Sequence, residues 1–420
     1  MNTPDLKKAR IEIGLFYLLL VMLIPRAYMV FDFEYWTEWA LQVHRFGVTN
    51  VYDNPSANYH PLYYYFLWIY DKIQGNEFFI TENINFIKFF PMFFDILPVV
   101  MLCCFRQKLI PEKIPYMYLL LNIAYLFNSC VWGQIDSIYS SLAFLALIVG
   151  FTRPVTSSLL FALALALKPQ PIVYIPLLLL VWMYSVRNVK TALLMLLTIA
   201  GTELLMALPF IVAGKFDGLW HIVSTAVGRY PQVSVGAFNI WYLIMKGNPY
   251  FTPDNLTYFV LTYKQVGLLL FLVSSGLIIA PLFFKTRRLR LADGAPERDL
   301  MQMLLLVCGL VSLYFFFFNT QMHERYAHPT VIFFFFYSVL RKDYKLYVLA
   351  SIPYFLSLDK LFPDFLPVQH YKIVWASKMI ALWYLLATAY GTWEFFKQYS
   401  IKREWQLLWS EWKSKRTITA

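Results

Sequence analysis

Long apolar runs separated by short charged breaks are the feature that most constrains this chain. The first run, Ile11 to Val30, is long enough to cross about 30 Å of hydrocarbon at a rise of about 1.5 Å per residue. Similar runs recur along the chain, and hydrophobic residues make up 59% of its 420 residues against 15% charged residues. Soluble domains carry about 25% charged residues. The sequence therefore predicts an integral membrane protein.

The runs predict an all-α polytopic bundle of about 12 spans, with a range of about 10–14. The first run is too long for a signal-peptide core and no small-residue cleavage site follows it, so we expect a retained first span. We expect spans near residues 11–30, 84–105, 114–131, 135–150, 155–168, 170–186, 190–213, 257–284, 299–319, 326–340, 343–358 and 371–396.

The positions of the basic residues predict which loops face the cytoplasm. Most of the 36 lysines and arginines fall in alternate loops and at both ends of the chain, which is the pattern of cytoplasmic segments. The net charge of +11 is thus spread over short loops, which argues against a nucleic-acid partner. We expect one transmembrane domain over residues 1–396 and a basic amphipathic cytoplasmic tail, 397–420, lying on anionic lipid.

Two long loops then face outward, 31–83 and 214–256, and both are rich in Trp, Tyr and Pro. Long loops in compact proteins are usually functional, and aromatic residues anchor at the membrane surface. We therefore expect interfacial helices in these loops. The four cysteines form no CxxC pair and no metal spacing, which favours simple packing over a disulfide framework or a zinc site.

An acidic and aromatic segment follows the first span directly. If it is helical, Asp32, Trp36 and Trp39 share one face, and Glu34 and Glu38 share another. A carboxyl group at the membrane surface is partly desolvated, which increases its basicity and suits it to general-base catalysis. From the spacing alone, an interfacial helix with solvated acids and anchoring tryptophans is the commoner case.

Five further outer or buried segments carry polar residues. Four of them also have a structural interpretation: a turn at Tyr59-His60-Pro61, a turn before Asp136, snorkelling of Lys168, and a solvated Arg229. His323, Glu324 and Arg325 lie together between two apolar spans, where such a cluster is usually functional. The spacing of the two histidines His323 and His328 is not that of a zinc motif, so we expect no metal.

Taken together, these residues resemble the GT-C class of multi-spanning glycosyltransferases that use lipid-phosphate sugars. The similarity runs from about residue 15 to 340 and is strongest to two groups. These are the endoplasmic-reticulum glucosyltransferases of dolichol-linked oligosaccharide assembly and the bacterial proteins related to the second mannosyltransferase of GPI-anchor synthesis. The matching positions are Asp32, Glu34 and Trp39; Tyr59, Pro61 and Leu62; Asp95, Pro98, Cys103 and Cys104; Lys168, Pro169 and Gln170; Phe238, Asn239 and Trp241; and His323, Glu324 and Arg325.

Two positions depart from the glucosyltransferases. His60 stands where they usually have a second proline, and Trp132-Gly133-Gln134-Ile135-Asp136 replaces a hairpin rich in His and Asn. The second form is closer to the bacterial and mannose-linked relatives. The sugar, mannose or glucose, and the acceptor are therefore left open.

The resemblance implies an inverting hexosyltransferase with a polyprenyl-phosphate donor, a lipid-linked glycan or other acceptor, and no cofactor. It implies Asp32 as the base, and Glu34, Trp39, Tyr59 and His60 as residues that bind or orient the acceptor. His323 and Arg325, then Arg229 and Lys168, are the expected contacts of the donor phosphate. Further pocket candidates are Glu324, Gln170, Asp136, Asn239 and Trp241.

The expected site faces away from the cytoplasm, in a bacterial plasma membrane in preference to an endoplasmic-reticulum membrane. The main alternative is a transporter or lipid flippase. Transporters often contain related halves, whereas this chain has no internal repeat and carries its polar clusters in outer loops. A third alternative is a membrane scaffold without catalytic activity. The sequence does not indicate an oligomeric state.

Overall fold

The computed structural model describes residues 3–23, 30–104, 114–226, 228–292, 298–361, 373–374 and 376–419. These residues are mainly helical, which confirms the all-α part of the expected fold class; their one sheet is a short antiparallel hairpin. The chain folds as two compact units built from segments far apart in the sequence. The first unit comprises Met1–Phe105, Leu126–Ile172 and Arg187–Arg229, and the second comprises Arg106–Tyr125, Val173–Val186 and Tyr230–Ala420.

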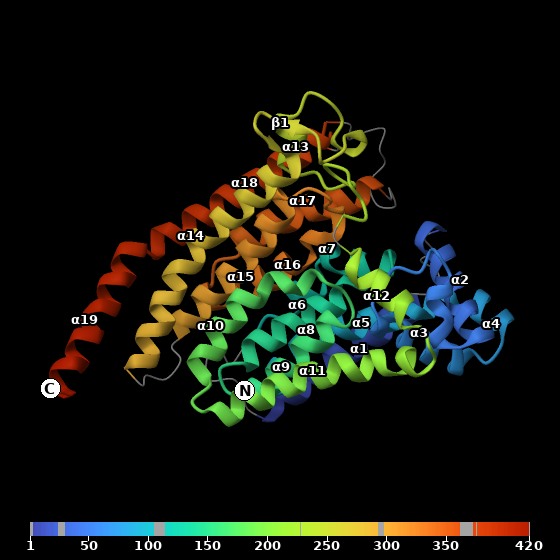
Figure 1. Ribbon diagram of the computed structural model, residues 1–420, viewed down its shortest axis with the longest axis horizontal. Helices are drawn as coiled ribbons and strands as arrows, with labels where there is room; N and C mark the ends of the chain where they lie inside the picture. The colour runs from blue at the N-terminus through green and yellow to red at the C-terminus, as the bar shows by residue number, and fades with distance from the viewer. Residues whose placement is uncertain are drawn as a thin grey trace. The chain divides into compact units, whose positions relative to one another are not determined.

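The first unit contains long apolar helices and a group of short amphipathic ones (Figure 1). Its elements are α1 (Thr3–Leu23), α2 (Val30–Phe46), η2 (Val48–Asp53), α3 (Pro61–Gln74), α4 (Glu77–Glu82), η3 (Ile84–Lys88), α5 (Phe89–Cys104), η4 (Phe127–Val131), α8 (Asp136–Val149), α9 (Pro154–Leu165), η5 (Gln170–Tyr174, which ends in the second unit), α11 (Val189–Val212) and α12 (Phe216–Ser224).

Helix α2 is amphipathic in the register that the sequence predicts. Phe33, Trp36 and Trp39 are buried along one face, while Glu34 and Glu38 are exposed. Asp32 lies in the first turn, where a negative charge is favoured by the helix dipole. Helix α2 packs against α3, and both lie with α4 in one group (Figure 1). The segment 31–83 is therefore helical, as expected; its place on the outer surface of a membrane stays a prediction.

Sharp local signals fix the ends of these short helices. Pro61 begins α3, a position where the missing N–H costs nothing. Gly75 ends it in a left-handed conformation with φ +77°, and its N–H donates to the carbonyl oxygen of Asp71. Asn76 then caps α4 by accepting a hydrogen bond from the N–H of Phe79. These stops hold α3 and α4 as separate helices on α2.

The second unit is built around a buried pair of helices, α15 and α16, packed against each other. In Figure 1, β1 and α13 lie together at one end of α14, and α19 runs beside α14. The elements are α6 (Met117–Leu120), α7 (Ile123–Leu126, which ends in the first unit), α10 (Ile175–Ser185), α13 (Ile240–Ile244), η6 (Pro249–Phe251), β1 (Thr257–Tyr258), β2 (Leu261–Thr262), α14 (Tyr263–Leu291), α15 (Arg298–Phe318), η7 (Glu324–Ala327), α16 (His328–Arg341), α17 (Lys345–Leu361), α18 (Ser377–Gln398) and α19 (Ile401–Thr419).

Four helices among the described residues are long and apolar enough to cross a membrane: Ile84–Leu102, Val189–Val212, Tyr263–Leu291 and Arg298–Phe318. Their surroundings differ, because 89% of the apolar window of Arg298–Phe318 is buried against 17% of that of Val189–Val212. Helix α15, Arg298–Phe318, therefore runs through the interior of its unit, whereas α11, Val189–Val212, presents an apolar surface suited to lipid. Shorter apolar helices cover Asp136–Val149, Pro154–Leu165 and Gln170–Ser185. The total of about 12 spans stays a prediction.

Two predicted spans are wrong in detail. Residues 114–131 form three short helical segments, because Asn122 interrupts them: its amide donates to Tyr347 and Ser351, and its oxygen accepts from the N–H of Tyr125. The span expected at 257–284 begins with the β1–β2 hairpin, and Thr262 then caps α14 in a capping box.

Some expectations fall partly outside the described residues. These include residues 24–29 of the first predicted span, 371–372 and 375 of the last, and the side chains of Cys103 and Cys104. Cys130 and Cys308 are free cysteines, as expected for residues used in packing. The tail is helical as α19, in which Trp405, Trp409 and Trp412 stack in series.

Candidate functional site

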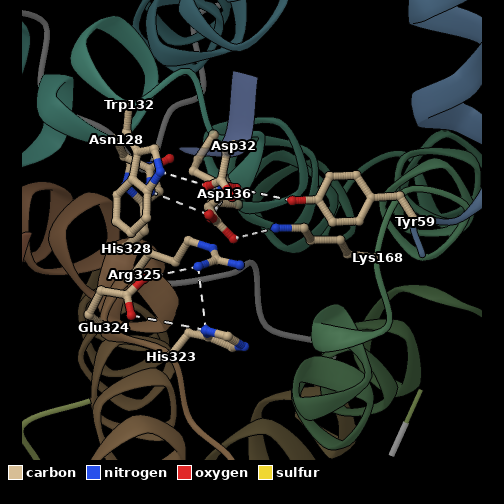
Figure 2. Close-up of polar contacts among 12 residues, drawn as sticks. Asp32, Tyr59, Asn128, Trp132, Asp136, Lys168, His323, Glu324, Arg325 and His328 are labelled. Carbon is tan, nitrogen blue, oxygen red and sulfur yellow. Dashed lines mark hydrogen bonds and ion pairs between the residues drawn. The ribbon is translucent and has the colours of Figure 1, made fainter. Parts of the chain in front are cut away.

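Asp32 is held by the turn that precedes α8. Its Oδ2 accepts hydrogen bonds from the indole Nε1 of Trp132 at 2.7 Å and from the amide Nε2 of Gln134 at 2.5 Å (Figure 2). The other oxygen, Oδ1, accepts no hydrogen bond from a described residue. It is not one of the buried polar atoms that lack a partner, so it is accessible. The carboxyl group is therefore fixed through one oxygen and leaves the other available.

The turn that supplies these donors requires glycine at its centre. Gly133 has φ +74°, a left-handed conformation that favours glycine. A Cβ atom at this position would lie 3.0 Å from the rings of both Phe33 and Trp36, and 3.2 Å from Cγ of Lys88. The backbone of the turn thus lies directly on α2. This close approach places the side chains on either side of Gly133 at the carboxyl group of Asp32.

An aromatic cluster contacts Gln134, the second hydrogen-bond donor to Asp32. The hydroxyl of Tyr59 donates to Oε1 of Gln134 at 3.1 Å. The ring of Tyr59 packs edge-on against Trp39 and Tyr63, with centroids 5.5 and 4.9 Å apart. Burial raises the pKa of the Tyr63 hydroxyl, and the nearby Asp32 charge adds to this shift. Asp32, Trp39 and Tyr59, predicted from the sequence, therefore belong to one group of side chains.

A buried ion pair lies next to this cluster. Nζ of Lys168 is 3.0 Å from Oδ1 of Asp136, and both side chains are inaccessible, with 5% and 0% exposed (Figure 2). The amide of Asn128 donates to the other oxygen of Asp136 at 3.3 Å. The ammonium group also lies 5.0 Å from the ring centroid of Tyr59. Lys168 thus reaches a protein carboxylate, which explains how a lysine is accommodated between apolar segments.

The remaining predicted site residues of the first unit differ in whether their polar groups already have partners within the protein. Arg229 is half-buried and forms no hydrogen bond or ion pair with a described residue, although its charge acts on the buried Tyr64. Glu34 is exposed and also makes no such contact. His60 donates from Nδ1 to the carbonyl oxygen of Leu165 at 2.9 Å, and burial lowers its pKa. The structure therefore gives His60 a role in joining α3 to the end of α9.

A second polar cluster lies in the second unit. Nη1 of Arg325 is 2.9 Å from Oε1 of Glu324 and 3.5 Å from Nδ1 of His323 (Figure 2). The segment is held by the outer loop: the N–H of Val235 donates to the carbonyl oxygen of Met322 at 2.9 Å, and the ring of Tyr230 packs edge-on against that of His323. The three residues predicted together from the sequence do form one cluster.

Asn239 and Trp241 support this loop. The amide of Asn239 donates to the carbonyl oxygen of Asn319 at 3.1 Å, and its oxygen caps α13. The indole of Trp241 donates to the carbonyl oxygen of Phe318 at 3.1 Å. Asp254, which the sequence analysis did not select, accepts from the side chains of Thr320 and Gln321. These contacts tie the segment before α14 to the end of α15.

Several buried polar residues of the first unit were not predicted as site residues. Trp132 and Gln134 hold Asp32, and Asn128 contacts Asp136. Lys88 and Asp95 are fully buried; Lys88 lies 5.0 Å from the ring of Phe33, and Asp95 accepts a hydrogen bond from Ser129. The available signal was polarity inside apolar runs, which is costly unless the group is paired. The oxygen of Gln170 is also buried, with no partner among the described residues.

The described residues contain no group of three His, Cys, Asp or Glu side chains arranged as metal ligands. The expectation that no metal is required stays a prediction. Comparison with protein-family models and with curated protein sequences finds no match to this chain. The site itself therefore has to carry the functional argument.

Proposed function

We propose that this chain is a membrane-embedded glycosyltransferase that moves a hexose from a polyprenyl-phosphate donor to a hydroxyl group of a lipid-linked glycan or another acceptor. The reaction takes place on the non-cytoplasmic face of the membrane. Asp32 is the general base. The resemblance of the sequence motifs to the GT-C class suggests the substrates, and the geometry of Asp32 supports the role of the base.

The observation that carries the proposal is the asymmetric environment of the Asp32 carboxylate. A base has to be held in a fixed orientation and still reach the proton that it removes. Two N–H donors fix Oδ2, whereas Oδ1 is free of protein donors among the described residues. A solvated acid that serves only to mark a helix terminus does not need two buried donors on one oxygen. The arrangement therefore favours a base over a simple interfacial acid.

In the proposed reaction, Oδ1 of Asp32 takes the proton of the acceptor hydroxyl. The acceptor oxygen attacks the anomeric carbon, and the bond from that carbon to the phosphate oxygen breaks with its electron pair. The products are the new glycoside, with inverted configuration, and the polyprenyl phosphate. Base catalysis of this kind contributes about 10²–10⁴-fold, and donors for the leaving phosphate contribute further.

Arg229 is the preferred candidate for a phosphate contact in the first unit, because its charge is available. Lys168 is already neutralised by Asp136 at 3.0 Å, whereas Arg229 forms no ion pair with a described residue. A guanidinium group can bind a phosphate through two parallel hydrogen bonds. His323 and Arg325 stay candidates for anion binding in the second unit, although Arg325 shares its charge with Glu324.

The test is sugar transfer by the purified protein in lipid vesicles that contain a polyprenyl-phosphate hexose and a mixture of lipid-linked glycans. Wild-type protein should lengthen a glycan by one hexose, as measured by mass spectrometry. Asp32→Asn should reduce turnover by about 10²-fold or more, because the amide cannot accept the proton. Asp53→Asn is the matched control: Asp53 lies in the same outer loop and forms only an exposed ion pair with Lys215.

Full activity of Asp32→Asn would remove the proposed base. Absence of transfer by the wild-type protein, with every donor and acceptor tried, would remove the proposed function. Equal losses in the Asp32 and Asp53 variants would indicate a general effect of charge in the loop.

A transporter or flippase is the second candidate, and the buried pair of Lys168 and Asp136 favours it. Paired charges inside apolar segments often mark the path of an ion or a substrate. The same vesicles distinguish the two functions: a transporter moves the labelled lipid sugar across the bilayer without lengthening any acceptor. Transport of the labelled lipid sugar that persists in Asp32→Asn and stops in Asp136→Asn would favour the transporter or flippase.

A further inference from the structure

We propose that the hydroxyl of Tyr63, together with Nε2 of His60, binds hydroxyl groups of the acceptor glycan. The inference rests on the proposed function and deepens it, because it names two neutral groups of the first unit that recognise a polyhydroxyl ligand. Its physical core is a pair of enclosed polar atoms at the start of α3, and that pair does not depend on which hexose is transferred.

The first observation is the hydroxyl of Tyr63, a residue that the sequence motifs did not select. Among the described residues, it is the only tyrosine hydroxyl that is enclosed by protein and has no hydrogen-bond partner. Its neighbours on α3 differ, since the hydroxyl of Tyr64 accepts from a backbone N–H and that of Tyr70 donates to a backbone carbonyl. An enclosed hydroxyl without a partner destabilises a fold, because its hydrogen bonds to water are lost. The Tyr63 hydroxyl therefore points to a ligand that supplies the partner.

The second observation is Nε2 of His60, which is also enclosed without a partner among the described residues. Nδ1 of the same ring lies 2.9 Å from the carbonyl oxygen of Leu165, which can only accept, so Nδ1 carries the proton. Burial lowers the pKa of His60 and favours the neutral ring, in which Nε2 is an acceptor. The hydroxyl of Tyr63 can donate or accept. The pair therefore suits the hydroxyl groups of a sugar, and it adds no positive charge for a phosphate.

Both side chains belong to the first turn of α3. His60 is the N-cap residue, and the N–H of Tyr63 donates to its carbonyl oxygen at 3.2 Å. The side chains of an N-cap residue and of the residue three positions further on lie close enough to reach the same group, as they do in a capping box. One helical turn therefore presents both hydrogen-bonding atoms.

Tyr63 also connects this turn to the proposed base. Its ring packs edge-on against Trp39 and Tyr59, with centroids 6.1 and 4.9 Å apart. Burial raises the pKa of Tyr63, and the charge of Asp32 is near enough to add to this shift. Because both atoms of the pair are enclosed in this structure, the ligand has to displace a side chain that covers them. The ring of Tyr59 is only partly buried and is the expected one.

Tyr70 supplies a matched control on the same helix. Tyr63 and Tyr70 are each 2% exposed, but the hydroxyl of Tyr70 donates to the carbonyl oxygen of Ile80 at 2.8 Å. Tyr70→Phe should lower the ratio of folded to unfolded protein about fivefold, because a buried carbonyl loses its donor. Tyr63→Phe should be at least as stable as wild type, because no hydrogen bond within the protein is lost. Unfolding in mixed micelles with increasing SDS measures both changes.

Use of the acceptor should show the opposite pattern. In the sugar-transfer assay at saturating donor, Tyr63→Phe should raise the acceptor KM about three- to tenfold, the range expected for one lost hydrogen bond. The donor KM should not change. His60→Asn should have the same effect, because asparagine keeps a donor for the carbonyl oxygen of Leu165 and has no atom at the position of Nε2. Tyr70→Phe should retain the wild-type acceptor KM.

A binding measurement gives a readout that does not require transfer. The protein in lipid nanodiscs is titrated with hexyl β-glucoside and with hexyl α-mannoside, each of which carries one hexose on a short alkyl chain. The rise in melting temperature gives the apparent Kd, and hexanol corrects for the effect of the chain. Wild type should bind at least one hexoside. Tyr63→Phe and His60→Asn should weaken that binding about three- to tenfold, whereas Tyr70→Phe should not.

The inference is overturned if Tyr63→Phe fails to fold or loses as much stability as Tyr70→Phe, because its hydroxyl would then have a structural role. It is also overturned if wild-type protein neither transfers sugar nor binds either hexoside. If both variants weaken hexoside binding but wild-type protein transfers no sugar, the polyhydroxyl site stands and the proposed function fails. If wild-type protein transfers sugar and both variants keep its acceptor KM, the proposed function stands and this inference fails.

Discussion

Replacing Lys168 by methionine should destabilise the first unit far more than the same change at Lys215. Both lysines bind an aspartate, at 3.0 Å for Lys168 with Asp136 and at 2.7 Å for Lys215 with Asp53. Their surroundings differ: 5% of the Lys168 side chain is exposed against 36% of the Lys215 side chain. The comparison therefore isolates the effect of burial on two ion pairs of similar length.

The expected magnitude follows from what remains after the substitution. Lys168→Met leaves the carboxylate of Asp136 buried without its lysine partner, while the amide of Asn128 still donates to its other oxygen. Removing one partner of a buried pair costs about 3–5 kcal/mol, which changes the ratio of folded to unfolded protein by about 10²–10⁴-fold. An exposed pair contributes about 0–1 kcal/mol, so Lys215→Met should be nearly neutral. The double variant Lys168→Met with Asp136→Leu should recover much of the loss, because both charges of this pair are then removed.

Reversible unfolding in mixed micelles with increasing SDS, followed by tryptophan fluorescence, gives the free energy of unfolding of each variant. Equal stabilities of Lys168→Met and wild type would refute the reasoning, because a buried carboxylate that has lost its lysine partner should destabilise the fold. A double variant that is less stable than either single variant would also contradict it. That result would mean that the packing of these side chains contributes more than their charges.

Three further predictions concern other parts of the first unit. Gly133→Ala should lower the melting temperature more than Gly214→Ala. Both glycines have positive φ, but only Gly133 has side chains of α2 within contact distance of an added Cβ atom. Equal losses in thermal unfolding would contradict the close approach of the Gly133 turn to α2. Burial lowers the pKa of His60 from its ordinary 6.5, so the unfolded chain binds the proton more tightly; this contribution to stability is present above about pH 6.5 and is lost as the pH falls toward the folded pKa. Melting temperatures from pH 8 to 5.5 should therefore fall more steeply for wild type than for His60→Gln. Parallel curves would argue against a contribution of His60 to this pH dependence. Arg229→Gln should raise the donor KM about tenfold with little effect on the acceptor KM, since the variant removes the proposed bidentate phosphate contact. An unchanged donor KM in steady-state kinetics would exclude that role.

The amphipathic helix α2 is an example of structure that the sequence predicts well. The buried face of α2, with Phe33, Trp36 and Trp39, follows directly from helical periodicity. The cluster of His323, Glu324 and Arg325 is also local, because the residues are consecutive. Patterns of this kind depend on neighbours along the chain, so one sequence suffices to find them.

The partners of Asp32 illustrate what could not be predicted. Trp132 and Gln134 lie a hundred residues further along, in a turn that the sequence presents only as polar residues between apolar runs. The interruption at Asn122 was missed for the same reason, since two of its partners, Tyr347 and Ser351, are far away in the chain. Side chains that meet only after folding leave no periodic signal.

The sequence alone determined that the chain consists mainly of apolar helices with an acidic, aromatic segment after the first of them, because composition and periodicity act over a few turns. Only the tertiary structure decided that Lys168 is neutralised by Asp136 and that Asp32 is held through one oxygen. The physical reason is that hydrogen bonds and ion pairs depend on distances of about 3 Å between groups that the chain brings together from remote positions.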